Sequence, residues 1–148
     1  MKALLRRLHA PVYGWRQKAL LGLVGDNLRS GESLLDVGCG GGTLAGALAR
    51  KYELSARGLE THPRKDCVIP VDPYDGESIP HADNSFDTVL LADVLHHEEQ
   101  PQRLLEEACR VAGKRVIVKD HKTGSILAWP RICLIDWAAN AGYDGRCL

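Results

Sequence analysis

Residues 33–43 read SLLDVGCGGGT, an apolar run followed by four glycines within five positions. A short apolar run bounded by turn residues is typical of a buried strand, so we expect a strand over residues 33–39. Glycines let the backbone turn sharply and let a ligand approach main-chain N–H groups without a Cβ in the way. Thr43 is a good N-cap residue, and we expect a helix to begin there. The stretch therefore predicts a strand, a turn suited to ligand binding and a helix.

Short apolar runs alternate with amphipathic stretches along the rest of the chain, which indicates an α/β fold. Further strands are predicted over residues 55–60, 67–74, 86–93 and 115–119, and helices over residues 2–9, 15–28, 101–113 and 125–141. Residues 61–66 are too few for a crossover helix between parallel strands, which takes about a dozen residues or more. Either a single turn replaces that helix or the strands have other limits.

The length of 148 residues predicts a single domain, with helices in residues 1–29, a core over residues 30–121 and a helix in residues 122–148. Hydrophobic residues make up 45% of the chain and 19 basic residues balance 19 acidic ones. This composition excludes a disordered chain and a strongly basic nucleic-acid binder. No run reaches the roughly 18–20 apolar residues that a membrane span needs, so we expect a cytoplasmic protein.

The five cysteines form no C-x-x-C pair, so neither a disulfide framework nor a zinc site is indicated, and no metal is expected. The glycine-rich turn also departs from the G-x-G-x-x-G pattern of dinucleotide-binding folds, because Thr43 stands at the last glycine position. An NAD-dependent oxidoreductase is therefore disfavoured. The segment that starts at Asp36 fits D-x-G-x-G-x-G better.

With this pattern the sequence resembles the class I S-adenosylmethionine-dependent methyltransferases, in particular the small-molecule branch that includes ubiquinone and menaquinone biosynthesis methyltransferases. Four further segments fall in the family's order and spacing: GLE at 58–60, DGESIP at 75–80, SFDTV at 85–89 and ADVLHH at 92–97. The resemblance covers about residues 30–121. It implies a Rossmann-like three-layer sandwich and methyl transfer from S-adenosylmethionine to a small-molecule acceptor.

The resemblance also implies where the cofactor lies. Asp36, at the carboxyl end of the first strand, would attract the ammonium group of the cofactor, directly or through water. The backbone of Gly38, Cys39 and Gly40 would contact its methionine part. Open α/β sheets bind ligands at the carboxyl ends of their strands, where all these residues are expected.

The second strand and the segment after the third would hold the nucleoside. Glu60 would accept hydrogen bonds from both ribose hydroxyls, with Thr61 beside it. Asp75 would accept from the adenine amino group while the N–H of Gly76 meets a ring nitrogen. Asp72 is the alternative to Asp75 if the strand ends earlier.

The end of the fourth strand would lie beside the reacting methyl. Ala92 and Asp93 would line the amino-acid side of the cofactor with backbone carbonyls, and His96 would sit near the transferred methyl. If the acceptor must lose a proton, His96, His97 or His121 can act as general base.

Structural alternatives stay open for several of these residues. The glycine-rich segment can be a simple strand-to-helix turn, Glu60 an exposed carboxylate at a strand end, and Asp75 a turn-forming residue, since Asp-Gly favours turns unaided. The pair His96 and His97 can be a solvated helix start.

The family's usual sheet has seven strands in the order 3-2-1-4-5-7-6. Only 27 residues follow His121, and their pattern is mostly helical. We therefore expect about five strands in the order 3-2-1-4-5, with the last two missing. The strand over residues 115–119 would then be an open edge, and we expect self-association through it or through the helix over residues 125–141. The alternative to an enzyme is a truncated, non-catalytic cofactor-binding or assembly module.

Overall fold

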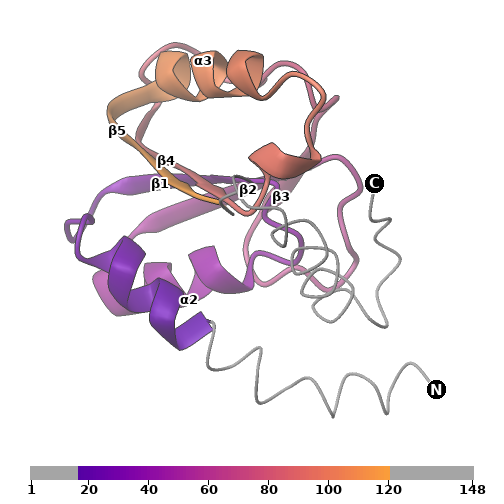
Figure 1. The fold of residues 1–148 in the computed structure, drawn as a ribbon. Coiled ribbons are helices and arrows are strands. Elements are labelled where there is room, and N and C mark those ends of the chain that lie inside the picture. Colours follow the sequence, from indigo (N-terminus) through magenta and orange to yellow (C-terminus); the bar gives the residue numbers. More distant parts are fainter. Residues whose placement is uncertain (1–16, 121–148) are drawn as a thin grey trace, which may run out of the picture. The chain divides into compact units, whose positions relative to one another are not determined.

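A five-stranded sheet with strand order β3-β2-β1-β4-β5 forms the centre of the protein (Figure 1). The structure is a computed structural model that describes residues 17–120. The strands are β1 (Ser33–Val37), β2 (Ser55–Glu60), β3 (Val71–Pro73), β4 (Phe86–Ala92) and β5 (Ala112–Lys119). All four neighbouring pairs are parallel. The α/β fold and the strand order predicted from the sequence are confirmed.

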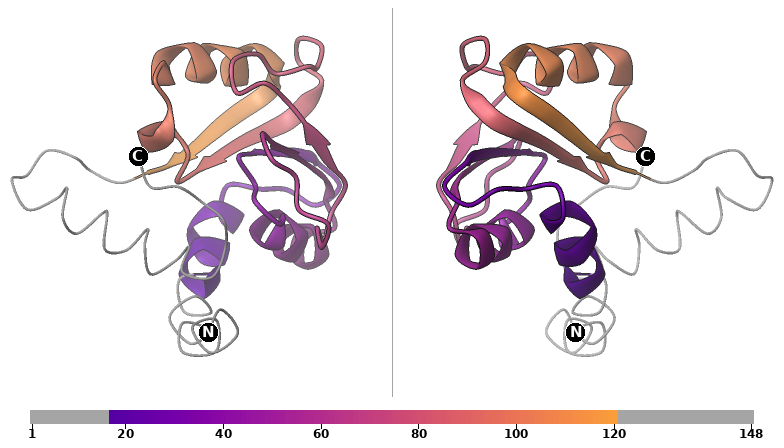
Figure 2. Two further views of the ribbon diagram at one scale, coloured as in Figure 1. Left: turned by 90° about the vertical axis from the view of Figure 1, so that its right-hand side faces the viewer. Right: turned by 90° about the vertical axis from the view of Figure 1, so that its left-hand side faces the viewer.

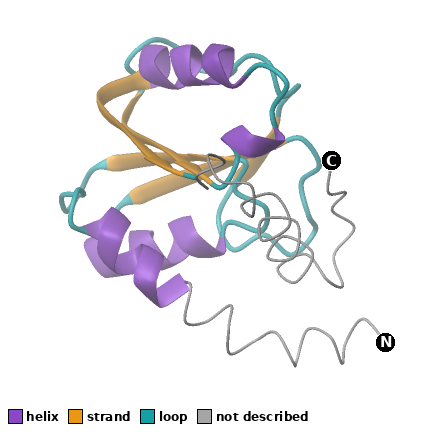
Figure 3. Cartoon of the chain, viewed as in Figure 1, coloured by secondary structure: helices purple, strands orange, loops and turns teal. Residues whose placement is uncertain are grey.

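Helices cover both faces of this sheet (Figures 2 and 3). Residues 17–25 are helical, and the other helices are α2 (Thr43–Tyr52), the 3-10 turn η1 (Leu95–His97) and α3 (Pro101–Val111). Figure 1 shows α2 on one side of the strands and α3 on the other. The resulting layers, helix on sheet on helix, are those of the predicted three-layer sandwich. No helix among residues 17–120 has the length and apolar character needed to cross a membrane.

The apolar core is split between the two faces of the sheet, because successive side chains of a strand point to opposite faces. In β1, Leu35 and Val37 pack in the cluster that contains Leu104 of α3. Leu34 packs in the other cluster, with Leu48 of α2. By this alternation Asp36 belongs to the α2 face. The central strands are buried on both faces, so their sequences read as almost continuous apolar runs.

Several predicted limits differ from those observed. The strand expected over residues 67–74 is only Val71–Pro73, and the segment between β2 and β3 is built from turns. The strand limits were thus the wrong part of the prediction, since the connection is longer than expected and needs no helix. The first strand ends at Val37 and the fourth at Ala92, each slightly earlier than predicted.

The junction between α3 and β5 also differs. We expected Gly113 to end the helix and the strand to begin at Arg115, but α3 ends at Val111 and β5 begins at Ala112. Gly113 is part of the strand, where a β-carbon would lie 3.4 Å from the backbone oxygens of Asn84 and Phe86. This distance is ordinary van der Waals contact, so packing at the start of the β4–β5 pairing does not require glycine.

The helix α2 begins where predicted, but its cap is different. Gly42 is the N-cap residue, with a φ of 72°, and Thr43 is the first helical residue without a side-chain cap bond. The left-handed backbone at the cap explains why glycine precedes the helix. The helices predicted over residues 2–9 and 125–141, and the expected absence of further strands, lie outside the described residues. The single-domain limits and self-association through β5 stay predictions.

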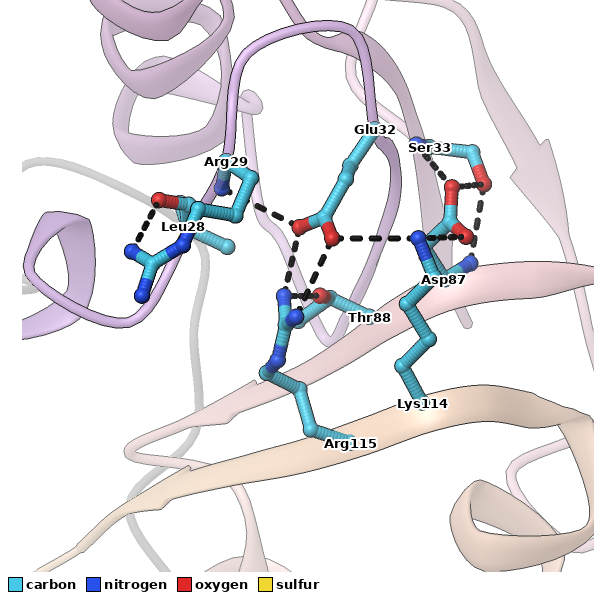
Figure 4. A network of polar contacts seen from close by, with 8 residues as sticks. All are labelled: Leu28, Arg29, Glu32, Ser33, Asp87, Thr88, Lys114 and Arg115. Carbon is cyan, nitrogen blue, oxygen red and sulfur yellow. Dashed lines mark hydrogen bonds and ion pairs between the residues drawn. The ribbon is translucent and has the colours of Figure 1, made fainter.

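At the amino ends of the strands, a network of charged groups ties β1, β4 and β5 together (Figure 4). Glu32, directly before β1, has a side chain only 8% exposed, and its carboxylate accepts hydrogen bonds from both terminal nitrogens of Arg115, at 2.5 and 3.0 Å. Lys114 and the backbone N–H of Arg29 also donate to it. Arg115 in turn reaches the buried hydroxyl of Thr88 at 2.9 Å.

A second carboxylate extends this network. Asp87 accepts hydrogen bonds from the backbone N–H and the hydroxyl of Ser33, at 2.8 and 2.9 Å, and pairs with Lys114 at 3.0 Å. The hydrogen bonds from Ser33, together with the charge of Lys114, lower the pKa of Asp87 to about 2. Each charged group taken out of water here has at least one opposite partner, which is the condition for burying it without a large cost.

We predict that Glu32→Gln lowers the free energy of unfolding at neutral pH by about 1–3 kcal/mol, because it leaves Arg115 with a neutral partner. The hydrogen bond from Arg115 lowers the pKa of Glu32 from 4.5 to about 2. A carboxylate with a lowered pKa in the folded state stabilises the fold above the pKa of the unfolded chain, and this contribution is lost as the pH falls.

The difference in the free energy of unfolding between Glu32→Gln and the unaltered chain should therefore shrink as the pH falls from about 4.5 to about 2. Urea denaturation across this range measures it. Glu53→Gln is the matched control, since Glu53 is an exposed glutamate that bonds Ser30, and its effect should stay within about 0.5 kcal/mol. An equal effect of both substitutions would show that the network does not stabilise the sheet.

Candidate cofactor-binding site

The glycine-rich loop between β1 and α2 has a backbone that only glycines adopt easily. Gly38, Gly40 and Gly42 have φ values of 68°, 58° and 72°. A β-carbon on Gly38 would lie 2.6 Å from a methyl group of Val94, and one on Gly42 would lie 2.4 Å from the side chain of Ile69. The loop is therefore packed against its neighbours so closely that a side chain at position 38 or 42 has no room.

Hydrogen bonds tie this loop to the end of β2. The backbone N–H groups of Gly38 and Cys39 both donate to the carbonyl of Leu59, at 2.8 and 3.2 Å. The N–H of Gly40 donates to the carboxylate of Glu60 at 2.7 Å. The structure thus brings these three predicted loop residues to Glu60, while their N–H groups are engaged within the protein. Their contacts with a cofactor stay a prediction.

Asp36 is the unusual charged residue of the site. It is 3% exposed, next to last in β1, and its neighbours across the sheet are Gly58 in β2 and Leu90 in β4. Among residues 17–120 no side chain or backbone group donates a hydrogen bond to its carboxylate, and none forms an ion pair with it. Burial, and secondarily the nearby charge of Glu60, raise the pKa of Asp36 from 3.8 to about 7.

Glu60, at the last position of β2, is held at the mouth of the loop. One carboxylate oxygen accepts from Gly40, and the other accepts from the N–H and the hydroxyl of Thr61, at 3.0 and 3.3 Å. The charge of Glu60 acts on Asp36, as the raised pKa of the latter shows. Two of the predicted cofactor residues are thus neighbouring carboxylates: Asp36 is buried and has no partner among residues 17–120, and Glu60 is bound to the loop.

Cys39 and Cys67 flank the same loop. Their sulfur atoms lie 3.8 and 4.0 Å from the carbonyl oxygen of Gly40. Burial is the main cause that raises the pKa of the Cys39 thiol, so it stays protonated and is a poor nucleophile. Cys39 therefore contributes packing and backbone to the site rather than covalent chemistry.

The segment after β3 forms a turn beside Thr61. The carboxylate of Asp75 accepts from the N–H groups of Glu77 and Ser78, at 2.8 and 2.9 Å, and these bonds lower its pKa. Gly76 has a φ of 87°, and a β-carbon there would lie 3.5 Å from the methyl group of Thr61. The turn-forming role that the sequence left open for Asp75 is thus observed, and its contact with adenine stays a prediction.

Asp72, the alternative to Asp75, points to another partner. It lies in β3 and forms an ion pair with Arg57 of β2, at 3.2 Å. Both side chains are about half exposed, so this pair contributes little to stability.

The end of β4 turns sharply at Asp93. Ala92 is the last residue of the strand, and Asp93 has a φ of 59°, in the left-handed region. The N–H of Asp93 donates to the carbonyl of Lys119 at 2.7 Å, and its carboxylate forms an ion pair with the Lys119 ammonium group. The side chain of Asp93 thus belongs to the β4–β5 junction, while its backbone lies at the strand end where the cofactor residues were expected.

His96 lies in η1 and has a partner that the sequence analysis missed. Its ring nitrogen Nδ1 lies 2.6 Å from a carboxylate oxygen of Asp120, and the ring of His97 lies against it, tilted by 42° with the centroids 3.9 Å apart. The signal for Asp120 was present, because it directly follows an apolar strand, as Glu60 ends one. Among residues 17–120 no three His, Cys, Asp or Glu side chains converge as a metal site.

Comparison with known proteins places this arrangement in a family. Residues 35–117 match the family described as methyltransferase domain. Ajmaline N-methyltransferase of Rauvolfia serpentina is 27% identical over 105 residues, which cover 61% of this chain and 36% of that protein. The mitochondrial ubiquinone biosynthesis O-methyltransferase of Schizosaccharomyces pombe is 31% identical over 94 residues, covering 53% of this chain and 33% of that protein.

Among solved structures, the PH0226 protein from Pyrococcus horikoshii superposes with a TM-score of 0.69 at 23% identity, over 82% of this chain and 63% of that one. This likeness shows the fold. The chain spans only about a third of the length of the curated relatives that it matches. The family match covers more than half of the chain and includes the glycine-rich loop, Glu60 and His96. The chain therefore belongs to the methyltransferase domain family, whose members of this type use S-adenosylmethionine.

Proposed function

We propose that this chain binds S-adenosylmethionine across the carboxyl ends of β1, β2 and β4 and transfers its methyl group to a small-molecule acceptor. The observation that carries the proposal is the Asp36 carboxylate, which is buried and has no hydrogen-bond or ion-pair partner among residues 17–120. A buried carboxylate is costly unless a cation or a hydrogen-bond donor reaches it. The α-ammonium group of the cofactor supplies both.

Glu60 supports the same placement. A ribose diol has two hydroxyl donors close together, and a carboxylate accepts both. The carboxylate of Glu60 faces the loop at the end of the strand next to β1, which puts it one strand away from Asp36. The two acids therefore suit opposite ends of one ligand, the ammonium end at Asp36 and the ribose at Glu60.

Methyl transfer from a sulfonium needs little covalent help from the protein. The cofactor supplies an activated methyl group whose leaving thioether is neutral. The chain's own contribution is to hold the donor and the acceptor in line, and such positioning can be worth roughly 7–11 kcal/mol. Gly38 and Gly42, packed tightly against Val94 and Ile69, make the loop a rigid support for this purpose.

A cofactor-binding module without turnover is the second candidate, because the predicted cofactor residues do not by themselves show that an acceptor is bound. The predicted cofactor residues all lie within residues 36–93, whereas the curated relatives are about three times as long as the part matched here. This candidate predicts binding of the cofactor with no transfer to any acceptor. The names of the relatives, which refer to ajmaline and to ubiquinone biosynthesis, do not fix the acceptor of this chain.

We predict that S-adenosylhomocysteine raises the melting temperature of the chain and that NADH does not. Asp36→Asn should weaken the binding of S-adenosylhomocysteine about 10- to 100-fold, because a charge-assisted hydrogen bond is lost. It should leave the affinity for 5′-methylthioadenosine unchanged, since that ligand lacks the amino-acid end. Glu60→Gln should weaken the binding of both ligands, because both contain the ribose. Isothermal titration calorimetry measures the affinities of the unaltered chain and of both variants for the two ligands.

Asp83→Asn is the control for these measurements. Asp83 is an exposed aspartate that pairs with Arg110 before β4, at the amino end of that strand. Asp83→Asn should leave the affinities for S-adenosylhomocysteine and 5′-methylthioadenosine unchanged. Stabilisation by NADH and none by S-adenosylhomocysteine would refute the proposed function.

The affinity for S-adenosylhomocysteine should rise with pH through about pH 7, because the ligand's ammonium group requires an ionised Asp36 whose pKa is about 7 in the free protein. Calorimetry between about pH 5.5 and pH 8 measures this dependence. In Asp36→Asn the part of the pH dependence that Asp36 causes should vanish. Any part that other groups cause should remain. An unchanged pH dependence in the variant would rule out Asp36 as the responsible group.

Without ligand, the raised pKa of Asp36 makes the ionised carboxylate a cost to the fold. The folded state binds this proton more tightly than the unfolded chain, so the contribution of Asp36 to stability falls as the pH rises from about 4 to about 7. Asp36→Asn should therefore be more stable than the unaltered chain at about pH 8, and this advantage should disappear towards about pH 4. Thermal unfolding of the two ligand-free proteins tests it, and a destabilised variant at the higher pH would contradict it.

A further inference from the structure

The segment between β3 and β4 is fastened to α3 on both sides of one residue, Ile79. The backbone N–H of Ile79 donates to a carboxylate oxygen of Glu107 at 2.9 Å, and its carbonyl accepts from Nη2 of Arg110 at 2.9 Å. The Ile79 side chain is buried and packs in the core cluster that contains Leu104 of α3. The main chain and the side chain of this residue are therefore both held by the same helix.

Glu107 and Arg110 are also bound to each other. Nε and Nη2 of Arg110 donate to the two carboxylate oxygens of Glu107, each at 2.8 Å. The hydrogen bond from Arg110 lowers the pKa of Glu107 to about 2, so the pair is ionised at neutral pH. A bidentate pair of this kind fixes the orientation of both side chains. The groups that hold Ile79 are therefore themselves held in place.

Arg110 extends the attachment along the chain. Its Nη1 donates to the carbonyl of His81 at 2.8 Å. The same nitrogen pairs with the exposed Asp83, and Arg103 pairs with Glu77 further along α3, but exposed ion pairs contribute little. The pair in the last turns of the helix therefore makes the main polar attachment of this segment.

The turn at residues 75–80 lies beside the residue that the proposed function assigns to the ribose. The backbone N–H of Tyr74 donates to the carbonyl of Glu60 at 3.3 Å. A β-carbon on Gly76 would lie 3.5 Å from the methyl group of Thr61, which follows Glu60. A base attached to a ribose at Glu60 can therefore reach this turn.

Asp75 has the acceptor capacity that adenine requires. The N–H groups of Glu77 and Ser78 both bind its Oδ1, and its Oδ2 accepts from the Ser78 hydroxyl at 3.3 Å. A carboxylate has about four acceptor positions, so Asp75 can also accept from the adenine amino group. The place of its carboxylate depends on the path of the turn, and that path is fixed four residues later, at Ile79.

We propose that Glu107 and Arg110 are positioning residues for adenine recognition, because by holding Ile79 they set the place of Asp75 and Gly76 against the base. This inference rests on the proposed function and on the adenine contact predicted for Asp75. The pair acts through the turn. Its effect should therefore be confined to the base and should not extend to the amino-acid end of the ligand.

The test compares S-adenosylhomocysteine with S-inosylhomocysteine, in which hypoxanthine replaces adenine. The amino group becomes a carbonyl oxygen, so the carboxylate of Asp75 faces an acceptor instead of a donor. We expect the unaltered chain to bind S-adenosylhomocysteine at least about 10-fold more tightly than S-inosylhomocysteine. Glu107→Ala should lower this ratio of affinities about 3- to 10-fold, because the N–H of Ile79 is no longer held. Calorimetry measures the affinities.

Further variants separate positioning from other effects. Glu106→Ala is the matched control, since Glu106 is the exposed preceding residue of α3, and it should leave the ratio unchanged. Glu107→Gln keeps an oxygen that can accept from Ile79 and should retain most of the discrimination. Arg110→Lys keeps the charge but not the planar fork and should lower the ratio as Glu107→Ala does. It carries the test if Glu107→Ala does not fold.

The ratio of the affinities for S-adenosylhomocysteine and 5′-methylthioadenosine should stay unchanged in Glu107→Ala, because both ligands carry adenine. A merely structural role would lower the free energy of unfolding and weaken the adenine and hypoxanthine ligands alike, and that result would overturn the proposal. Equal binding of these two ligands by the unaltered chain would also overturn it, as would an equal effect of Glu106→Ala and Glu107→Ala on the ratio.

Failure of the proposed function has a different signature, since the unaltered chain then binds neither S-adenosylhomocysteine nor S-inosylhomocysteine. Binding of S-adenosylhomocysteine with a ratio that Glu107→Ala and Arg110→Lys leave unchanged refutes the positioning role alone. A selective loss of discrimination in these two variants supports both the proposed function and the role of the pair.

Discussion

A carboxylate that leaves water needs a positive charge or hydrogen-bond donors to compensate for lost hydration, and Asp36 has neither within residues 17–120. Its position follows from the sheet: β1 is the middle strand, covered on both faces, and Asp36 alternates with the buried Leu35 and Val37. The strand can carry an acid there only because its carboxyl end adjoins a loop of glycines. The proposed cofactor geometry, the influence of Glu60 and the raised pKa all depend on this one carboxylate.

The buried carboxylates Glu32 and Asp36, at opposite ends of the sheet, have opposite pKa shifts. At the amino ends, Glu32 is also buried but receives the guanidinium of Arg115 and the ammonium of Lys114, so its pKa is low. At the carboxyl ends, Asp36 has no such partner within the described part of the chain and its pKa is raised to about 7. The Glu32 network thus stabilises the sheet at the end away from the site, while Asp36 carries an electrostatic cost within the site. This division is expected where binding, rather than folding, satisfies a buried charge.

The fold was predictable because its strongest signals are local. The apolar runs of β1 and β4 and the glycines at residues 38–42 each restrict the backbone on their own, and they indicated the fold class, whereas the strand order followed from the resemblance to the methyltransferase family. The limits of β3 and β5 were not predictable, because they depend on contacts with other strands, such as the approach of Gly113 to Phe86. The same holds in the site: Asp36 and Glu60 follow a rule about strand ends, whereas the bonding of Asp75 within its own turn and of His96 to Asp120 depends on tertiary placement.

The helix α3 ends at Val111 and β5 begins at Ala112, so no loop residue connects the two elements. Side chains in a strand alternate between faces, so gaining or losing one residue at this junction would turn every side chain of β5 to the opposite face. Arg115 would then point away from Glu32 at one end of the sheet, and Asp120 would be displaced from His96 at the other. An insertion or deletion is therefore tolerated less well here than in the turns after β2, since a change of one residue would break the Glu32–Arg115 and His96–Asp120 contacts together.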